Sequence, residues 1–108
     1  MGEKASIMIV DDDSSLCRTM SLVLSRKGHA VHTAQDGLEA IEKVKQMAVD
    51  MIFMDVKMPG MDGVEAFKVI KGIRPRIAVT MMTAYAVDDL LEEAMREGAH
   101  GVMHKPLD

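Results

Sequence analysis

Short apolar runs alternate with longer amphipathic stretches along this chain, and this alternation restricts the possible folds more than any other feature of the sequence. The apolar runs span 6–10, 51–54, 77–82 and 101–104, and a shorter, more polar run at 29–33 is typical of an edge strand. Apolar runs of this length indicate buried strands, whereas amphipathic stretches of about ten residues or more indicate helices. The pattern therefore predicts an α/β fold, with a parallel sheet whose strands are joined by right-handed helical crossovers.

The amphipathic stretches carry apolar residues at helical spacing, on one predicted face each. These are Leu16, Met20, Val23 and Leu24 in the first, Leu38, Ile41, Val44 and Met47 in the second, Val64, Phe67 and Ile70 in the third, and Leu90, Leu91, Ala94 and Met95 in the fourth. Asp13 or Ser14 can cap the first helix and Asp62 the third, while Gly28 and Gly98 suit helix ends.

Length, cysteine content and charge exclude several classes of protein. A chain of 108 residues fits one domain, and Cys17, as the single cysteine, cannot form an internal disulfide or a zinc cluster. A lone thiol is typical of a cytoplasmic protein. No apolar run approaches the ~20 residues that a membrane span needs. The formal charge of -4 argues against a nucleic-acid-binding surface, which would be basic. Asp11, Asp12, Asp13 and Asp55 account for the whole excess of 17 acidic over 13 basic residues.

The residues best suited to chemistry directly follow predicted strands. They are Asp11, Asp12 and Asp13 after the first strand, Asp55 after the third, Thr83 after the fourth and Lys105 after the fifth. The carboxyl ends of parallel strands share one edge of the sheet, where open α/β folds bind their ligands. We therefore expect these sequence-distant residues to converge in one crevice.

Such a group of side chains is suited to a phosphoryl group and a hard divalent cation. Clustered carboxylates repel unless a cation lies among them, and their oxygens favour Mg²⁺ or Mn²⁺. The hydroxyl of Thr83 and the ammonium of Lys105 are donors for phosphoryl oxygens, and Asp55 is a candidate carboxylate nucleophile. Asp13 and Asp62, in contrast, are predicted mainly as helix caps.

Four sequence blocks stand in a fixed order along the chain. They are the first strand with Asp11-Asp12-Asp13, the string Met54-Asp55-Val56-Lys57-Met58-Pro59-Gly60-Met61-Asp62-Gly63, the pair Thr83-Ala84, and Gly98-Ala99 followed by Lys105-Pro106. Over nearly the whole chain, they resemble the receiver domain of two-component response regulators. The resemblance implies a flavodoxin-like, doubly wound, five-stranded parallel sheet of order 2-1-3-4-5, which periodicity alone does not supply.

The resemblance also implies roles for the carboxylates. Asp55 would be the phosphoacceptor, taking a phosphoryl group from a phosphohistidine of a sensor histidine kinase or phosphotransfer protein. Asp12 and Asp55 would hold Mg²⁺, or Mn²⁺, through their side chains and Lys57 through its backbone carbonyl, with Asp11 helping by charge or through water. The domain would then be a signalling switch that dephosphorylates itself slowly, not a turnover enzyme.

A second set of implied roles concerns the switch. Thr83 would bond a phosphoryl oxygen in the active state and draw its loop inward, which would change the surface near the fourth helix and fifth strand. Lys105 would pair with the phosphoryl group or with Asp55, aimed into the site by a cis peptide before Pro106. Relatives usually carry an aromatic ring three residues before this lysine, where Val102 stands here. A ring-flip mechanism is therefore not expected, and Lys57 and Tyr85 would tune dephosphorylation.

The resemblance further implies a fifth helix after Asp108, so that 1–108 would be a receiver domain truncated before that helix. An apolar face would then be exposed, which favours a homodimer or a swapped dimer. The sequence does not identify a downstream output domain. Direct nucleic-acid binding and membrane contact by this domain are not expected.

Two other functions remain open at this point. One is an interaction module that is never phosphorylated, and the presence of Val102 in place of an aromatic residue favours it. The other is a phosphohydrolase of the haloacid dehalogenase type, which needs a second Asp two residues after its nucleophile. Lys57 occupies that position after Asp55, whereas Asp13 stands at that spacing after Asp11. The string around Asp55 has no place in the hydrolase scheme.

Overall fold

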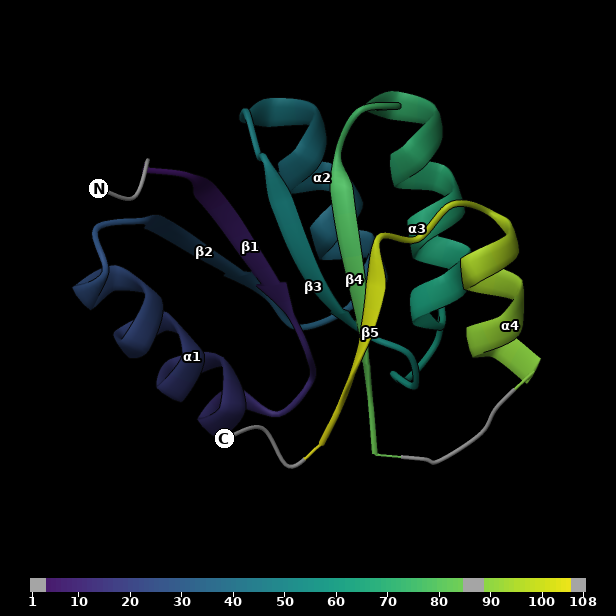
Figure 1. Cartoon of the computed structure of the whole chain (residues 1–108), viewed down its shortest axis with the longest axis horizontal. Helices are drawn as coiled ribbons and strands as arrows, with labels where there is room; N and C mark the ends of the chain where they lie inside the picture. Colours follow the sequence, from purple (N-terminus) through teal and green to yellow (C-terminus); the bar gives the residue numbers. More distant parts are fainter. Residues whose placement is uncertain (1–3, 85–88, 106–108) are drawn as a thin grey trace.

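A computed structural model describes residues 4–84 and 89–105. Five strands form one parallel sheet in the order β2-β1-β3-β4-β5, as the resemblance implied (Figure 1). The strands are β1 (Ser6–Val10), β2 (Ala30–Ala34), β3 (Met51–Asp55), β4 (Ala78–Thr83) and β5 (Gly101–His104). The helices of the described part are α1 (Ser14–Arg26), α2 (Gly37–Gln46), α3 (Gly63–Ile73) and α4 (Asp89–Arg96). No helix within 4–84 or 89–105 is long and apolar enough to cross a membrane.

The sheet separates two apolar layers of unequal size. The larger core joins the sheet to α2, α3 and α4, with Phe67 and Ile70 among its fully buried members. The smaller layer lies under α1 and has Ile9, Cys17 and Met82 as its buried residues. Along β1, Met8 belongs to the larger layer and Ile9 to the smaller, as predicted for a strand buried on both faces. Among the described residues, α2, α3 and α4 therefore cover one face of the sheet and α1 is the helix that packs on the other (Figure 1).

Short side chains and glycines fix the helix ends. Asp13 caps α1 and Asp62 caps α3, both as predicted, and Asp36 caps α2 in the same way. Each caps by accepting backbone N–H groups of the first helical turn, which otherwise lack partners. Gly28 and Gly98 take left-handed conformations with φ of 96° and 98° after α1 and α4, so they end these helices as predicted.

The predicted apolar faces are partly wrong. Leu38 was expected to point inward but is 64% exposed, because the buried stripe of α2 consists of Gly37, Ala40, Ile41 and Val44. Its neighbours in sequence occupy the inward positions, which leaves Leu38 on the border of the stripe. Val23 on α1 and Met95 on α4 are also about half exposed, at 49% and 46%.

Candidate functional site

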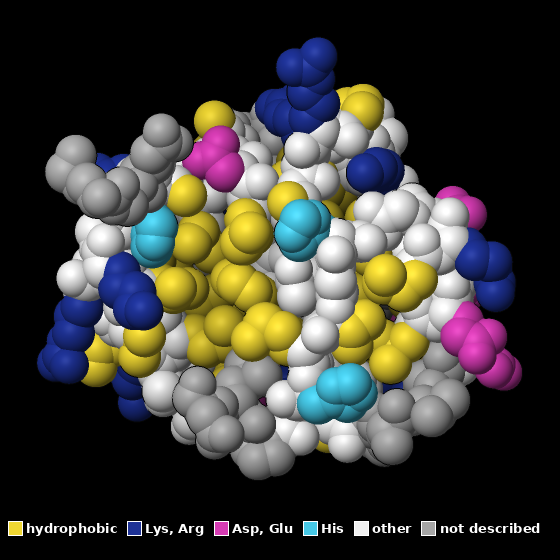
Figure 2. Space-filling model, in the orientation of Figure 1, with side chains coloured by type: hydrophobic (Ala, Val, Ile, Leu, Met, Phe, Trp, Pro, Cys, Tyr) yellow, Lys and Arg dark blue, Asp and Glu magenta, His cyan; other side chains and the backbone are white. Residues whose placement is uncertain are grey.

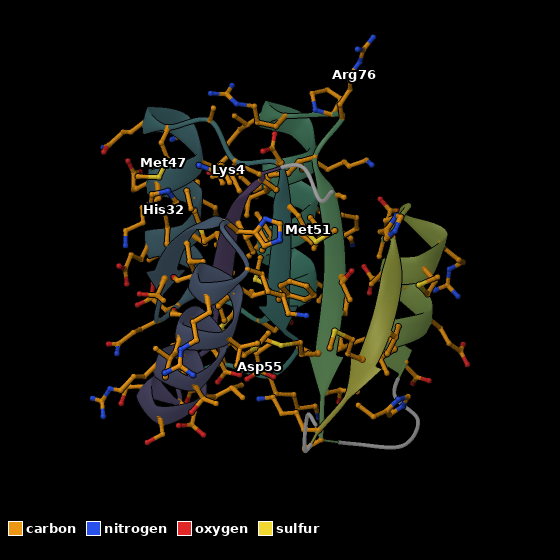
Figure 3. All side chains as sticks on the ribbon, turned by 60° about the vertical axis from the view of Figure 1, so that its left-hand side comes forward. Lys4, His32, Met47, Met51, Asp55 and Arg76 are labelled. Atoms are coloured by element: carbon orange, nitrogen blue, oxygen red, sulfur yellow. The ribbon has the colours of Figure 1, made fainter. Side chains whose placement is uncertain are left out.

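The predicted site residues follow strands that lie side by side in the sheet. Val10 pairs with Met54 and Asp55 pairs with Met82, so Asp11 and Asp55 leave the central strands at the same level. On the other side, Thr83 ends β4 opposite His104, which directly precedes Lys105. Figure 3 shows Asp55 at this carboxyl edge of the sheet. The strand register therefore brings residues nearly a hundred positions apart to one edge.

The three consecutive aspartates differ in environment. Asp11 is fully buried, and its two carboxylate oxygens accept hydrogen bonds from the backbone N–H of Asp13 at 2.9 Å and from Lys105 Nζ at 2.6 Å. Asp12 is exposed. Asp13 turns away from the site and accepts the backbone N–H groups of Ser15 and Leu16 at the start of α1. One run of identical residues thus supplies a buried acceptor, an exposed carboxylate and a helix cap.

Asp55 is a buried carboxylate in a negatively charged environment. Its side chain is only 9% exposed, and Lys105 Nζ lies 3.4 Å from one of its oxygens. Burial, together with the negative charges of Asp11 and Asp12, raises the pKa of Asp55 to about 6, although Lys105 partly opposes this shift. Asp55 is therefore mainly ionised at neutral pH, and a cation nearby would stabilise that form.

Lys105 neutralises part of this charge. Burial lowers the pKa of its ammonium, but the hydrogen bond to Asp11 and the charge of Asp55 outweigh that effect and raise the pKa above its usual value. Its backbone N–H donates to the carbonyl of Thr83 at 2.7 Å, which ties the residue to the end of β4. The structure therefore holds a permanent positive charge between two carboxylates, and the shorter of its two contacts is to Asp11.

The acidic group can accommodate a hard divalent cation. Asp11, Asp12 and Asp55 each offer a carboxylate oxygen, and these atoms all lie within 4.8 Å of one another. Oxygen donors of this kind match Mg²⁺, which usually keeps several waters and takes one or two carboxylates. Because both oxygens of Asp11 already accept hydrogen bonds from the protein, Asp12 and Asp55 are the better candidates for direct ligands.

The remaining predicted residues differ in how the structure places them. Thr83 is buried at the end of β4, and Lys57 is exposed in the loop after β3. Val102 is partly buried on β5 and packs against the larger core. Pro106, with the peptide before it, and Tyr85 lie outside the described residues, so the roles given to them stay predictions.

Sequence reasoning missed two features of the site. It did not pair Lys105 with Asp11, because the expected convergence of one lysine with several aspartates at a sheet edge does not say which of them the lysine contacts. It also gave Gly63 no role beyond its place in the string that begins at Met54, whereas the backbone of Gly63 lies against the backbone of Asp55. The signal for Gly63 was its place directly after a helix cap, where the start of α3 meets the end of β3.

Comparison with known proteins points to one group. Residues 7–108 match the family described as the response regulator receiver domain. The chain is 42% identical over 107 residues to the transcriptional regulatory protein ZraR of Klebsiella oxytoca, covering 99% of this chain and 24% of that protein. It is 37% identical over 108 residues to sporulation initiation phosphotransferase F of Bacillus subtilis (strain 168), covering 100% of this chain and 86% of that protein.

A solved structure shows the same fold. The chemotaxis protein CheY4 of Vibrio cholerae superposes with a TM-score of 0.92 at 31% identity, over 98% of this chain and 90% of that one. The chain thus spans most of the length of this protein and of sporulation initiation phosphotransferase F, at 90% and 86%. In contrast, it spans about a quarter of the length of the ZraR relatives, with 24% coverage.

Proposed function

The chain belongs to the response regulator receiver family, and from this premise we propose that it is a phosphorylation-controlled switch in which Asp55 accepts a phosphoryl group from a phosphohistidine. The donor would be a sensor histidine kinase or a phosphotransfer protein, and the proposed location is the cytoplasm. One observation carries the proposal: the carboxylate of Asp55 lies 3.4 Å from Lys105 Nζ and within 4.8 Å of the oxygens of Asp11 and Asp12. A candidate nucleophile, carboxylate oxygens that could hold a cation and a fixed positive charge therefore lie close together, which supports the proposal.

The chemical step requires the ionised form of Asp55. One of its oxygens forms the new O–P bond while the P–N bond of the phosphohistidine breaks, and the electron pair of that bond stays on the imidazole nitrogen, which then takes up a proton. A bound Mg²⁺ supplies charge neutralisation for the phosphoryl oxygens. Lys105 stays protonated and can move its ammonium contact from a carboxylate to a phosphoryl oxygen. Asp11 holds Lys105 in reach of that position.

The proposed response to phosphorylation passes from Thr83 to α4. Phosphorylation adds charge and acceptor oxygens next to Thr83, whose hydroxyl would bond one of them. The chain leads from Thr83 to α4, a helix of eight residues with only Leu91 and Ala94 buried. An ion pair between Lys68 on α3 and Glu93 on α4 adds a contact between exposed groups. Because α4 is short and has two buried residues, a small movement at Thr83 is expected to change the surface around it.

A phosphorylation assay tests the proposal directly. The protein is incubated with Mg²⁺ and acetyl phosphate and then weighed by mass spectrometry. We expect a gain of one phosphoryl group, no gain for Asp55→Asn, and an unchanged gain for Asp36→Asn, which alters the cap of α2. No gain in the wild type, or a gain that survives Asp55→Asn, would contradict the proposal.

A second function, an interaction module that is not phosphorylated, is favoured by one feature. Val102 stands where relatives usually carry an aromatic ring, and its partly buried side chain packs into the core instead. Beryllofluoride with Mg²⁺ distinguishes the two functions, because it imitates a phosphoryl group on a carboxylate. An amide NMR spectrum that changes around Thr83 and α4 supports the switch, whereas an unchanged spectrum supports the interaction module.

A further inference from the structure

Gly63 is the first residue of α3 and lies against the peptide bond that follows Asp55. A Cβ atom built on Gly63 would lie 2.0 Å from the carbonyl oxygen of Asp55, 2.9 Å from its carbonyl carbon and 3.0 Å from the Cα of Val56. All three are backbone atoms, which cannot rotate away as the end of a flexible side chain can. Any side chain at Gly63 must therefore displace either the start of α3 or the end of β3.

Space, not backbone conformation, requires glycine at this position. The glycines with positive φ in the described part of the chain are Gly28, Gly60 and Gly98, so Gly63 has a conformation open to other residues. The local hydrogen bonds explain the close approach. The N–H of Gly63 donates to the carbonyl of Val56 at 2.7 Å, and the N–H of Val56 donates to the carbonyl of Met82 at 2.9 Å.

The backbone on which Asp55 is mounted is therefore held from two sides. On one side, β4 binds Val56 through Met82. On the other side, α3 closes on the carbonyl of Asp55, and the Asp62 side chain, which accepts the N–H of Glu65 at 2.9 Å, fixes where α3 begins. A shift of the Asp55 backbone would carry its carboxylate away from Lys105 and Asp12.

We infer that Gly63 is a positioning residue for the phosphoacceptor: its missing side chain lets α3 close on the Asp55 carbonyl and hold the carboxylate at the distance that phosphoryl transfer needs. The inference rests on the proposed function of Asp55. Misplacement of a reacting group by about 1 Å can reduce a rate by about a hundredfold. A side chain at Gly63 should thus reduce phosphorylation far more than its effect on folding explains.

Two other glycines provide matched controls. At Gly72, in the same helix, an added Cβ meets nothing within 4 Å, so Gly72→Ala adds a methyl group to α3 without a clash. At Gly37, an added Cβ would lie 3.0 Å from the Cβ of Ala66 and 3.2 Å from the Sδ of Met61. Gly37→Ala therefore strains the packing of α2 on α3 without contacting the backbone of Asp55.

The experiment measures three quantities for the wild type, Gly63→Ala, Gly37→Ala and Gly72→Ala. They are the phosphorylation rate at saturating acetyl phosphate and Mg²⁺, the dissociation constant for Mg²⁺, and the melting temperature. For Gly63→Ala we expect a rate at least about tenfold lower and a weaker affinity for Mg²⁺. For Gly37→Ala we expect a lower melting temperature with a rate close to that of the wild type, and for Gly72→Ala no loss of either.

The outcomes separate this inference from the proposed function. A wild type that is not phosphorylated contradicts the proposed function, and this inference falls with it. A phosphorylated wild type with Gly63→Ala within about twofold of its rate overturns the positioning role alone, as does an equal loss of rate in Gly37→Ala. If Gly63→Ala does not fold, the same rates are measured at low temperature with Gly72→Ala added to stabilise α3. Failure to fold there would show that Gly63 serves the fold as a whole, which also overturns the inference.

Discussion

At the scale of single residues, Asp55 is ionised at the expense of stability. Its pKa is about 6 in the folded protein, against 3.8 for an ordinary aspartate, because the side chain is buried beside Asp11. Between pH 3.8 and about pH 6, the folded state binds more protons at Asp55 than the unfolded state does. Stability therefore falls as the pH rises through this range and stays at the lower level above it. The charge that Asp55 needs for its proposed role as a nucleophile therefore opposes folding.

Asp55→Asn is accordingly expected to stabilise the protein at neutral pH in the presence of a chelator. After allowance for solvent screening, we expect the free energy of unfolding in urea to rise by about 1–2 kcal/mol at neutral pH and to be unchanged below about pH 4. The control is Asp36→Asn, which keeps a good cap on α2 and should alter stability little at either pH. A gain of equal size at both pH values would contradict the charge argument, because it would come from packing.

Mg²⁺ should reverse this effect in the wild type. A ligand that binds only the folded state raises the melting temperature, and a cation beside Asp55 lowers the pKa of its carboxyl group. We expect added Mg²⁺ to raise the melting temperature of the wild type and to have little effect on Asp12→Asn or Asp55→Asn. Differential scanning calorimetry with and without Mg²⁺ measures this. An undiminished response in Asp12→Asn would remove Asp12 from the metal site.

The position of these residues could be predicted from the sequence, but their pairing could not. The convergence of Asp11, Asp55 and Lys105 follows from strand order, since the carboxyl ends of parallel strands meet at one edge. Lys105 Nζ lies 2.6 Å from the carboxylate of Asp11 and 3.4 Å from that of Asp55. Which carboxylate it approaches more closely therefore depends on a difference of less than 1 Å between two side-chain distances. No pattern of residue types contains that information. The place of Gly63 after a helix cap marks the start of α3, but how closely it approaches the backbone of Asp55 is seen only in the structure.

At the scale of helices and strands, the caps were the most predictable features and the apolar faces the least. Asp13 and Asp62 act locally, through N–H groups two or three residues away, so the sequence alone determines them. Whether Leu38 is buried depends on the rotation of α2 about its own axis relative to the sheet. The packing of the elements around α2 sets that rotation. A predicted strand end also differs from the observed one by one residue. β2 begins at Ala30 rather than at position 29, because its pairing with β1 begins there.

The cap on α1 can be separated from the metal site by mutation. Removing the side chain in Asp13→Ala leaves the N–H groups of Ser15 and Leu16 without their acceptor, and we expect a loss of about 1 kcal/mol in the free energy of unfolding. Asp13→Ser should restore most of it, because serine also caps helices. Both variants should keep the Mg²⁺ response of the wild type, as followed by calorimetry. A lost response in Asp13→Ser would show that Asp13 belongs to the metal site.

At the scale of the whole molecule, the two faces of the sheet are covered unequally. Figure 2 shows apolar side chains gathered over the face of the sheet on which α1 packs. A groove of about 210 Å³ runs between α1 and the sheet, and its lining residues are Leu16, Thr19, Met20, Val23, Leu24, Phe53 and Met103. An apolar surface of this kind favours association, because contact removes it from water. An apolar groove therefore lies on the α1 side of the sheet, and the truncation before a fifth helix stays a prediction.

We expect the chain to associate with a second copy of itself through this face, so that its average mass in sedimentation equilibrium rises with protein concentration. Val23 lies on the rim of the groove and is 49% exposed in a single copy. Val23→Lys places a charge there and should weaken association at least about tenfold, because burying an unpaired charge is unfavourable. Leu38→Lys makes the same kind of change on α2, which packs on the opposite face of the sheet, and should leave association unchanged. Equal effects of the two substitutions would indicate non-specific contact between copies. The mass of a single chain at every concentration would show that the apolar face does not bind a second copy.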